Sequence, residues 1–214
     1  MNKKLITLIT VGIFSFALSS TSFADSGTLG KSYILPEVLY GQFGDNQLDE
    51  DLDAYYGGGV TLNVNLVPHL DLQVGGGYLW ADGDRGSVDL SLDQMAGAIG
   101  LLAFMDPEAQ MTPYAFASFN IVDWEVEAKG PGGTSKQDDT DEGFGGGAGV
   151  QFKVTPKFII DASGNYLDVG DSDSWGADLD FGYWFRSNIQ GTLGGSYNFD
   201  SEDMSILVGA LFTL

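Results

Sequence analysis

Apolar and polar side chains alternate along most of the chain after residue 31, in runs of about ten residues. The clearest pair of runs covers residues 144–154 and 158–166 and is separated by Thr155-Pro156-Lys157. In the first run the even positions from Phe144 to Val154 are apolar or glycine, whereas the odd ones are glycine, Gln151 or Lys153. A repeat of two over about ten residues predicts two-faced strands that are long enough to cross a bilayer when tilted. The pattern favours a transmembrane β-barrel with its apolar face toward lipid.

Runs of this kind recur along the rest of the chain. We expect strands over residues 32–43, 54–65, 70–81, 88–104, 112–127, 144–154, 158–169, 175–185, 189–199 and 204–214. The connections alternate in kind. Those at 66–69, 105–111, 155–157 and 186–188 hold a proline or a tight polar turn, and those at 44–53, 82–87, 128–142, 170–174 and 200–203 hold most of the acids. The sequence therefore predicts an all-β, antiparallel up-and-down transmembrane β-barrel of ten strands, with eight strands as the alternative.

One predicted strand does not keep a single alternation. Val88, Leu90 and Leu92 share one parity, whereas Ile99 and Leu101 have the other. An extra residue inserted into one strand of a pair would shift the parity in this way. We therefore expect a β-bulge within residues 88–104, at a position that the sequence does not fix.

The first 24 residues have the features of an export signal. Lys3 and Lys4 precede an apolar run over residues 5–18, and Ser22-Phe23-Ala24 forms a small-residue cleavage site. The alternative is a membrane-anchoring helix, but an apolar core of about 14 residues is shorter than the roughly 20 that span a bilayer. We expect a signal peptide over residues 1–24 and one barrel domain over residues 25–214.

The chain is strongly acidic, with 30 Asp and Glu, nine Lys and Arg and a net charge of −21 at pH 7. Such a charge repels nucleic acid, and it repels anionic lipid headgroups unless metal cations intervene. Cysteine is absent, which excludes disulfides and thiol chemistry. We expect a monomer that contacts outer-membrane lipid and lipopolysaccharide, the latter through divalent cations, and that has no nucleic-acid partner.

Aromatic residues gather near the ends of the predicted strands, where barrels carry girdles at the two membrane interfaces. The alternative is that aromatic side chains favour strands wherever they occur. Strand 112–127 would carry Tyr114 and Trp124 at opposite ends of its lipid face. The remaining girdle candidates are Tyr78, Trp80, Tyr166 and Trp175 on the outer side, and Phe152, Phe158, Tyr183, Phe185 and Phe212 on the inner side.

Charged residues on the predicted polar faces would line the lumen. The candidates are Glu37, Asp93, Glu125, Lys153, Asp161, Asp178 and Asp180. Buried carboxylates are costly without water or counter-charges, so these residues favour a narrow, hydrated, cation-preferring lumen. Asp178 and Asp180 lie on the same face, and neighbouring carboxylates can act as an acid/base pair when one of them has a raised pKa. The alternative is that they only line a hydrated polar interior, which every barrel needs.

No other group of residues suggests chemistry. His69, the only histidine, follows Pro68 in a predicted turn and is accompanied by no Ser-His motif. The loop acids, such as Asp45 and Asp49, lack the spacing of a calcium-binding EF-hand loop. The sequence therefore predicts no catalytic residue, no metal site and no cofactor.

Residues 56–84 and 144–171 each combine a glycine-rich strand, a proline turn and an aromatic-ended strand. In these segments the chain resembles the outer-membrane β-barrel family typified by the transmembrane domain of outer-membrane protein A, over about residues 32–185. The resemblance implies location in the bacterial outer membrane. It also implies that the last strand, Ile206 to Leu214, presents a signal to the outer-membrane insertion machinery. The family barrel has eight strands, and a further hairpin follows here.

Three functions stay open at this point. The first is a structural barrel or a narrow cation-preferring pore for small solutes. The second is a surface-binding, adhesin-type barrel that uses its acidic extracellular loops. The third is a barrel enzyme based on carboxylates alone, which we do not expect.

Overall fold

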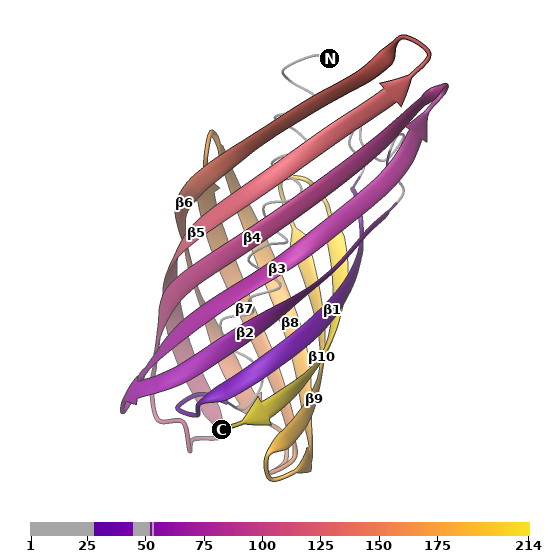
Figure 1. Cartoon of the computed structure of the whole chain (residues 1–214). Helices are drawn as coiled ribbons and strands as arrows, with labels where there is room; N and C mark the ends of the chain where they lie inside the picture. Colours follow the sequence, from indigo (N-terminus) through magenta and orange to yellow (C-terminus); the bar gives the residue numbers. More distant parts are fainter. Residues whose placement is uncertain (1–27, 45–51, 53) are drawn as a thin grey trace.

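The chain folds into a closed barrel of ten antiparallel strands (Figure 1). The computed structural model describes residues 28–44, 52 and 54–214. The strands are β1 (Tyr33–Gln42), β2 (Ala54–Val67), β3 (Leu70–Arg85), β4 (Val88–Phe104), β5 (Met111–Gly130), β6 (Gly133–Lys153), β7 (Phe158–Val169), β8 (Ser172–Arg186), β9 (Ile189–Asn198) and β10 (Met204–Thr213). Each strand pairs with its neighbours in sequence, and β1 pairs with β10 to close the sheet. The predicted ten-stranded up-and-down barrel is confirmed. The predicted signal peptide, 1–24, lies outside the described residues.

The barrel has two ends, which we call the terminal end and the far end. The terminal end holds the start of β1 and the end of β10, because Tyr33 pairs with Thr213. It also carries the four short connections that follow β2, β4, β6 and β8. None of the described residues forms a helix long and apolar enough to cross a bilayer.

The two faces of the wall follow from the alternation of side chains. Along β1 the burial alternates without interruption, with Leu35 inside at 0 % exposure and Val38 outside at 64 %. The inward face is not simply polar, because Tyr33, Leu35 and Leu211 pack together with Ile159 and Trp184 inside the terminal half. The outward face carries the exposed aliphatic side chains that the alternation assigned to lipid.

Two hairpins are much longer than the sequence predicted. The strands β3 and β4 continue to a turn at 86–87, and β5 and β6 continue to a turn at 131–132. The expected loops at 82–87 and 128–142 are therefore wrong, because most of their residues extend the strands. Hydrophobic alternation could not reveal these strands, since their side chains are mainly acidic or small. Most of the expected loop at 44–53 lies outside the described residues.

The predicted bulge in β4 is also wrong. β4 pairs with β3 from Val88 to Ala103 and with β5 from Asp89 to Phe104 without a register shift. Leu92 and Gln94 are both buried inside, and Asp93 therefore points outward. The parity of the apolar residues changes along β4 although the backbone alternation does not.

The strand β5 has the opposite facing from the one predicted. Tyr114, Val122, Trp124 and Val126 are buried inside, whereas the odd-numbered Ile121 is exposed outside at 43 %. Tyr114 and Trp124 are thus not girdle residues, and Glu125 is not on the inward face.

The inward face at the far end is largely apolar. Trp124 belongs to a cluster of buried residues on β1 to β5, β10 and the connection after β1, which we call the far-end cluster. Its members are Leu39, Phe43, Leu52, Tyr55, Leu79, Ala81, Leu92, Trp124, Val126 and Leu207. These contacts explain why β5 turns its apolar side chains inward here.

The other girdle candidates lie on the outward face. Rings on adjacent strands contact one another, with centroid separations of 6.1 Å for Tyr56 and Trp80 and 4.8 Å for Tyr166 and Trp175. The outward set also includes Tyr78, Phe152, Phe158, Tyr183, Phe185 and Phe212. Their role as membrane girdles stays a prediction.

Asp203 holds the connection between β9 and β10 against the connection after β1. Its Oδ1 accepts a hydrogen bond of 2.7 Å from the Gly44 N–H, and its Oδ2 accepts one of 2.7 Å from the Ser201 hydroxyl. Burial raises the pKa of this carboxyl to about 6, although these two hydrogen bonds oppose the shift. The folded protein therefore binds a proton at Asp203 more tightly than the unfolded chain does.

We expect the free energy of unfolding to rise on acidification because of this one group. The folded pKa lies above the ordinary value of 3.8, so the contribution is greatest below pH 4 and is lost as the pH rises through 6. The change amounts to about 2–3 kcal/mol between pH 7 and pH 4. The free energy of unfolding, measured between pH 4 and pH 7 for the wild type and for Asp203→Asn, tests this prediction. It should fall with rising pH more steeply in the wild type, and equal pH dependence in the two proteins would contradict the raised pKa of Asp203.

Candidate functional site

The hairpins β3–β4 and β5–β6 extend as a four-stranded sheet past the other strands at the far end (Figure 1). Directly paired residues share a face, and Asp93, Glu125 and Asp138 form one row across β4, β5 and β6 on the outward side. Asp84 and Asp89 pair in the same way. We call this surface the acidic face. Its nine acidic residues are Asp82, Asp84, Asp89, Asp93, Asp123, Glu125, Glu127, Asp138 and Glu142.

The acidic face is only partly neutralised by its own lysines. Lys136 lies 2.7 Å from Glu125, and Lys129 lies 2.9 Å from Glu127. Like charges directly opposite each other on a sheet are destabilising, so the row through Asp93, Glu125 and Asp138 stores repulsion that a bound cation would relieve. Within the part of the chain that the structure describes, no group of three or more His, Cys, Asp or Glu residues is arranged to hold a metal ion. A cation on this face would therefore need ligands from a second molecule.

The inward carboxylates form a second group. Asp161 on β7 pairs directly with Asp180 on β8, and Asp178 lies two residues from Asp180 on the same face. Asp161 accepts a hydrogen bond from the Tyr114 hydroxyl across β6. The Asp178 Oδ2 accepts hydrogen bonds of 2.6 Å from Asn165 and 3.2 Å from Ser163. These contacts make the three carboxylates parts of a polar network.

The structure separates the remaining lumen candidates. Glu37 lies inside on β1 and is 8 % exposed, and Lys153 lies at the terminal end of β6. Asp93 and Glu125 were predicted inside but belong to the acidic face, because β4 has no bulge and β5 has the opposite facing. His69 stands in the β2–β3 turn, and its Nδ1 lies 2.9 Å from the Met105 carbonyl oxygen.

Sequence reasoning missed Asp71 as an organising residue. Its carboxylate accepts hydrogen bonds from the Gly30 N–H, at 3.0 Å, and from the side-chain amides of Asn63 and Asn65, at 3.0 and 2.7 Å. These contacts fix the segment before β1 against β2 and β3. The asparagine side chains on the polar face of β2 were the available signal.

Comparison with known proteins decides the family. The sequence profile described as "Outer membrane protein beta-barrel domain" matches residues 10–199. The chain belongs to this family. No curated protein matches the sequence.

Two solved autotransporter barrels share the fold of this family member at low identity. The transport unit of the autotransporter AIDA-I from Escherichia coli is 13 % identical with a TM-score of 0.60, over 95 % of this chain and 99 % of that one. The translocator domain of the autotransporter NalP from Neisseria meningitidis is 11 % identical with a TM-score of 0.60. The match covers 99 % of this chain and 98 % of that one. The N-terminal barrel of OprF from Pseudomonas aeruginosa is 14 % identical over 86 % and 99 %, with a TM-score of 0.38.

The family places this barrel in the bacterial outer membrane. Bacterial outer-membrane barrels have short turns in the periplasm and longer loops outside. The two hairpins that extend past the other strands lie at the far end, so we expect the far end to face outward and the terminal end to face the periplasm. In this orientation the acidic face would lie next to the outer leaflet that surrounds the barrel.

Proposed function

We propose that this outer-membrane barrel is a surface-binding protein whose acidic face engages lipopolysaccharide through shared divalent cations. The supporting observation is the row of Asp93, Glu125 and Asp138 on strands that continue past the barrel wall. The row continues into the exposed ring of Trp80 on β3, which pairs directly with Asp93, and the Tyr78 hydroxyl donates a hydrogen bond to Asp93. Its nearest neighbours are then the headgroups around the barrel. Carboxylates and phosphates repel each other, and a divalent cation with oxygen ligands from both joins them.

The long paired strands make this a rigid surface. The β5–β6 hairpin keeps its register from Met111 to Gly130, and the carboxylates therefore hold fixed spacings along and across the strands. Thr140 on β6 donates a hydrogen bond of 2.9 Å to Asp123 on β5, which ties the two strands together on the same face. Binding to a preformed surface costs less conformational entropy than binding by a loop that must become ordered.

Neutralising the row tests this function. In the triple variant Asp93→Asn, Glu125→Gln, Asp138→Asn, we expect lipopolysaccharide binding in magnesium to weaken by about tenfold, because several charge-assisted contacts are lost. Removing magnesium with a chelator should weaken the wild type to the same level. The matched control is Asp178→Asn, Asp180→Asn, which removes inward charges and should bind as the wild type does. Binding that does not depend on magnesium, or that the control also loses, would contradict the proposal.

A second candidate function is a narrow cation-preferring pore. Glu37, Asp161, Asp178 and Asp180 all lie on the inward face, and they favour cations over anions. Planar-bilayer recordings test this function, and Asp178→Asn, Asp180→Asn should then lower the cation preference. Absence of conductance, or a preference for anions, would reject the pore and leave the surface function untouched.

A further inference from the structure

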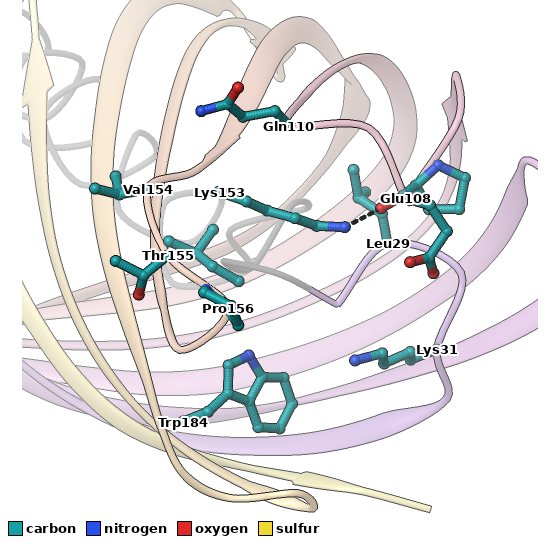
Figure 2. Close-up of a pocket in the computed structure, with 11 residues that line it drawn as sticks. Leu29, Lys31, Glu108, Gln110, Lys153, Val154, Thr155, Pro156 and Trp184 are labelled. Atoms are coloured by element: carbon teal, nitrogen blue, oxygen red, sulfur yellow. Dashed lines mark hydrogen bonds between the residues drawn. The ribbon is translucent and has the colours of Figure 1, made fainter.

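A cavity of about 510 Å³ opens at the terminal end of the barrel (Figure 2). It lies between the segment before β1, the β4–β5 and β6–β7 turns and the end of β8. Its volume falls in the range of roughly 300–1,000 Å³ that is usual for small-molecule sites. Leu29, Ile159 and Trp184 supply apolar walls, and Lys31, Lys153 and Glu108 supply charges. We call it the mouth cavity.

Lys31 is held in place by the barrel wall. The Gly30 N–H donates to Asp71, and the Lys31 carbonyl oxygen accepts a hydrogen bond of 2.6 Å from Asn63. Leu29 packs with Leu102 and Phe104. The Lys31 ammonium lies 4.7 Å from the centre of the Trp184 ring, and that ring is buried. These contacts fix the Lys31 backbone and place its ammonium group over the Trp184 ring.

Lys153 enters the cavity from β6 and donates a hydrogen bond to the Pro107 carbonyl oxygen (Figure 2). Among the described residues no carboxylate forms an ion pair with Lys31 or Lys153, and Glu108 is the one acidic residue that lines the cavity. Burial and then the charge of Lys153 lower the pKa of Lys31, whereas Glu108 raises it. The two ammonium groups thus repel each other in a site where, among the described residues, Glu108 supplies the single carboxylate.

More basic residues surround the same place. Lys157 and Arg186 line an adjacent hollow that shares Lys31 and Trp184 with the mouth cavity. Four of the seven Lys and Arg residues after residue 24 therefore gather at one end of a protein whose net charge is −21. Their position contrasts with the acidic face at the opposite end of the barrel.

We propose that the mouth cavity binds a small amphipathic anion, with a phosphate or carboxylate between Lys31 and Lys153 and an apolar body against Leu29 and Ile159. The anion supplies the negative charge that the lysine pair lacks. Charge-assisted hydrogen bonds from two ammonium groups give affinity and orientation. This inference does not depend on the surface function proposed above, because the two sites lie at opposite ends of the barrel.

Phenyl phosphate, titrated calorimetrically into the full barrel folded in a non-ionic detergent, tests the site. We expect saturable binding at one site per barrel. Lys31→Gln and Lys153→Gln should each weaken it about tenfold, since each removes a hydrogen bond to a charged group. Glu108→Gln should tighten binding several-fold, because it removes the one carboxylate in the cavity. Glu108 is an exposed turn residue, so Glu108→Gln should fold as the wild type does. Tighter binding by this variant cannot result from misfolding.

The matched control is Lys129→Gln, which removes an exposed lysine at the opposite end of the barrel. It should bind phenyl phosphate as the wild type does, and benzyl alcohol should not bind. The proposal is overturned if no saturable binding occurs, if Lys129→Gln weakens binding as much as Lys31→Gln, or if benzyl alcohol binds equally well. Repeating the titration in phosphatidylcholine nanodiscs with and without phosphatidylglycerol identifies the source. Loss of binding only with phosphatidylglycerol assigns the site to a lipid phosphate, and unchanged binding assigns it to a soluble anion.

Discussion

Replacing Trp124 with alanine should lower the free energy of unfolding by about 3–5 kcal/mol. Trp124 is 7 % exposed and lies in the far-end cluster with Leu92 and Val126. The substitution leaves a cavity among these side chains, and it removes the 2.9 Å hydrogen bond from the indole Nε1 to Asp141. Reversible urea unfolding in lipid vesicles, followed by circular dichroism, measures the loss.

Two controls separate the contributions to this loss. Trp124→Phe keeps a ring in the cluster and should cost about 1 kcal/mol through the lost hydrogen bond. Trp175→Ala removes an outward side chain that is 58 % exposed, and its effect should be less than half that of Trp124→Ala. Equal effects of the two alanine substitutions would show that Trp124 lies outside the barrel, as the alternation of its strand had suggested.

Replacing Gly149 with valine should cost about 3 kcal/mol or more. A Cβ atom at Gly149 would lie 2.2 Å from the Tyr114 hydroxyl oxygen and 2.7 Å from the Ala162 carbonyl oxygen. The Tyr114 ring crosses the inward side of β6 at this glycine and donates its hydroxyl hydrogen to Asp161 on β7. A side chain at 149 displaces the ring and leaves Asp161 without that donor.

The control is another strand glycine that faces open space. A Cβ atom at Gly97, on the outward side of β4, would meet its nearest atom at 3.9 Å. Gly97→Val should therefore change the free energy of unfolding by less than about 0.5 kcal/mol. The same unfolding assay compares both variants, and a similar cost at the two glycines would contradict the close approach of Tyr114.

The strand segments whose outward side chains are apolar throughout could be predicted from sequence. In β1 up to Tyr40, β3 up to Trp80 and β8 from Trp175, the outward side chains are apolar or glycine and the inward ones are small, polar or mixed, so a repeat of two identified strand and facing together. The closure of ten strands followed from the alternation of short and acidic connections. Both predictions depended on local contrast between the two faces of a strand.

The facing of β4 and β5 could not be predicted in this way. Toward the terminal end Ile99 and Ile121 point outward, the side that faces lipid in an outer-membrane barrel. Toward the far end Leu92 and Trp124 point inward because the far-end cluster lies there, and Asp93 and Glu125 point outward. The apolar side therefore changes from outside to inside along a regular strand. The change of parity near Gln94 comes from this change of the apolar side rather than from a β-bulge.

Whether the candidate site residues were placed correctly also depended on the facing of their strands. Asp178 and Asp180 were placed inside because β8 keeps one facing, whereas Asp93 and Glu125 were placed there through the misread parity. The mouth cavity could not be inferred, since Lys31 and Lys153 are far apart in sequence and are joined only by closure of the barrel. The hydrogen bonds of Asp71 that position Lys31 are likewise long-range.

Labelling of single-cysteine variants along β5 by a membrane-impermeant maleimide on intact cells tests the acidic face most directly. The natural chain contains no cysteine, so each variant carries one reporter. Positions 123, 125 and 127 should react quickly, positions 122, 124 and 126 should react slowly, and positions 119 and 121 should be shielded by lipid. Fast labelling at the even positions with protection at the odd ones would contradict the account.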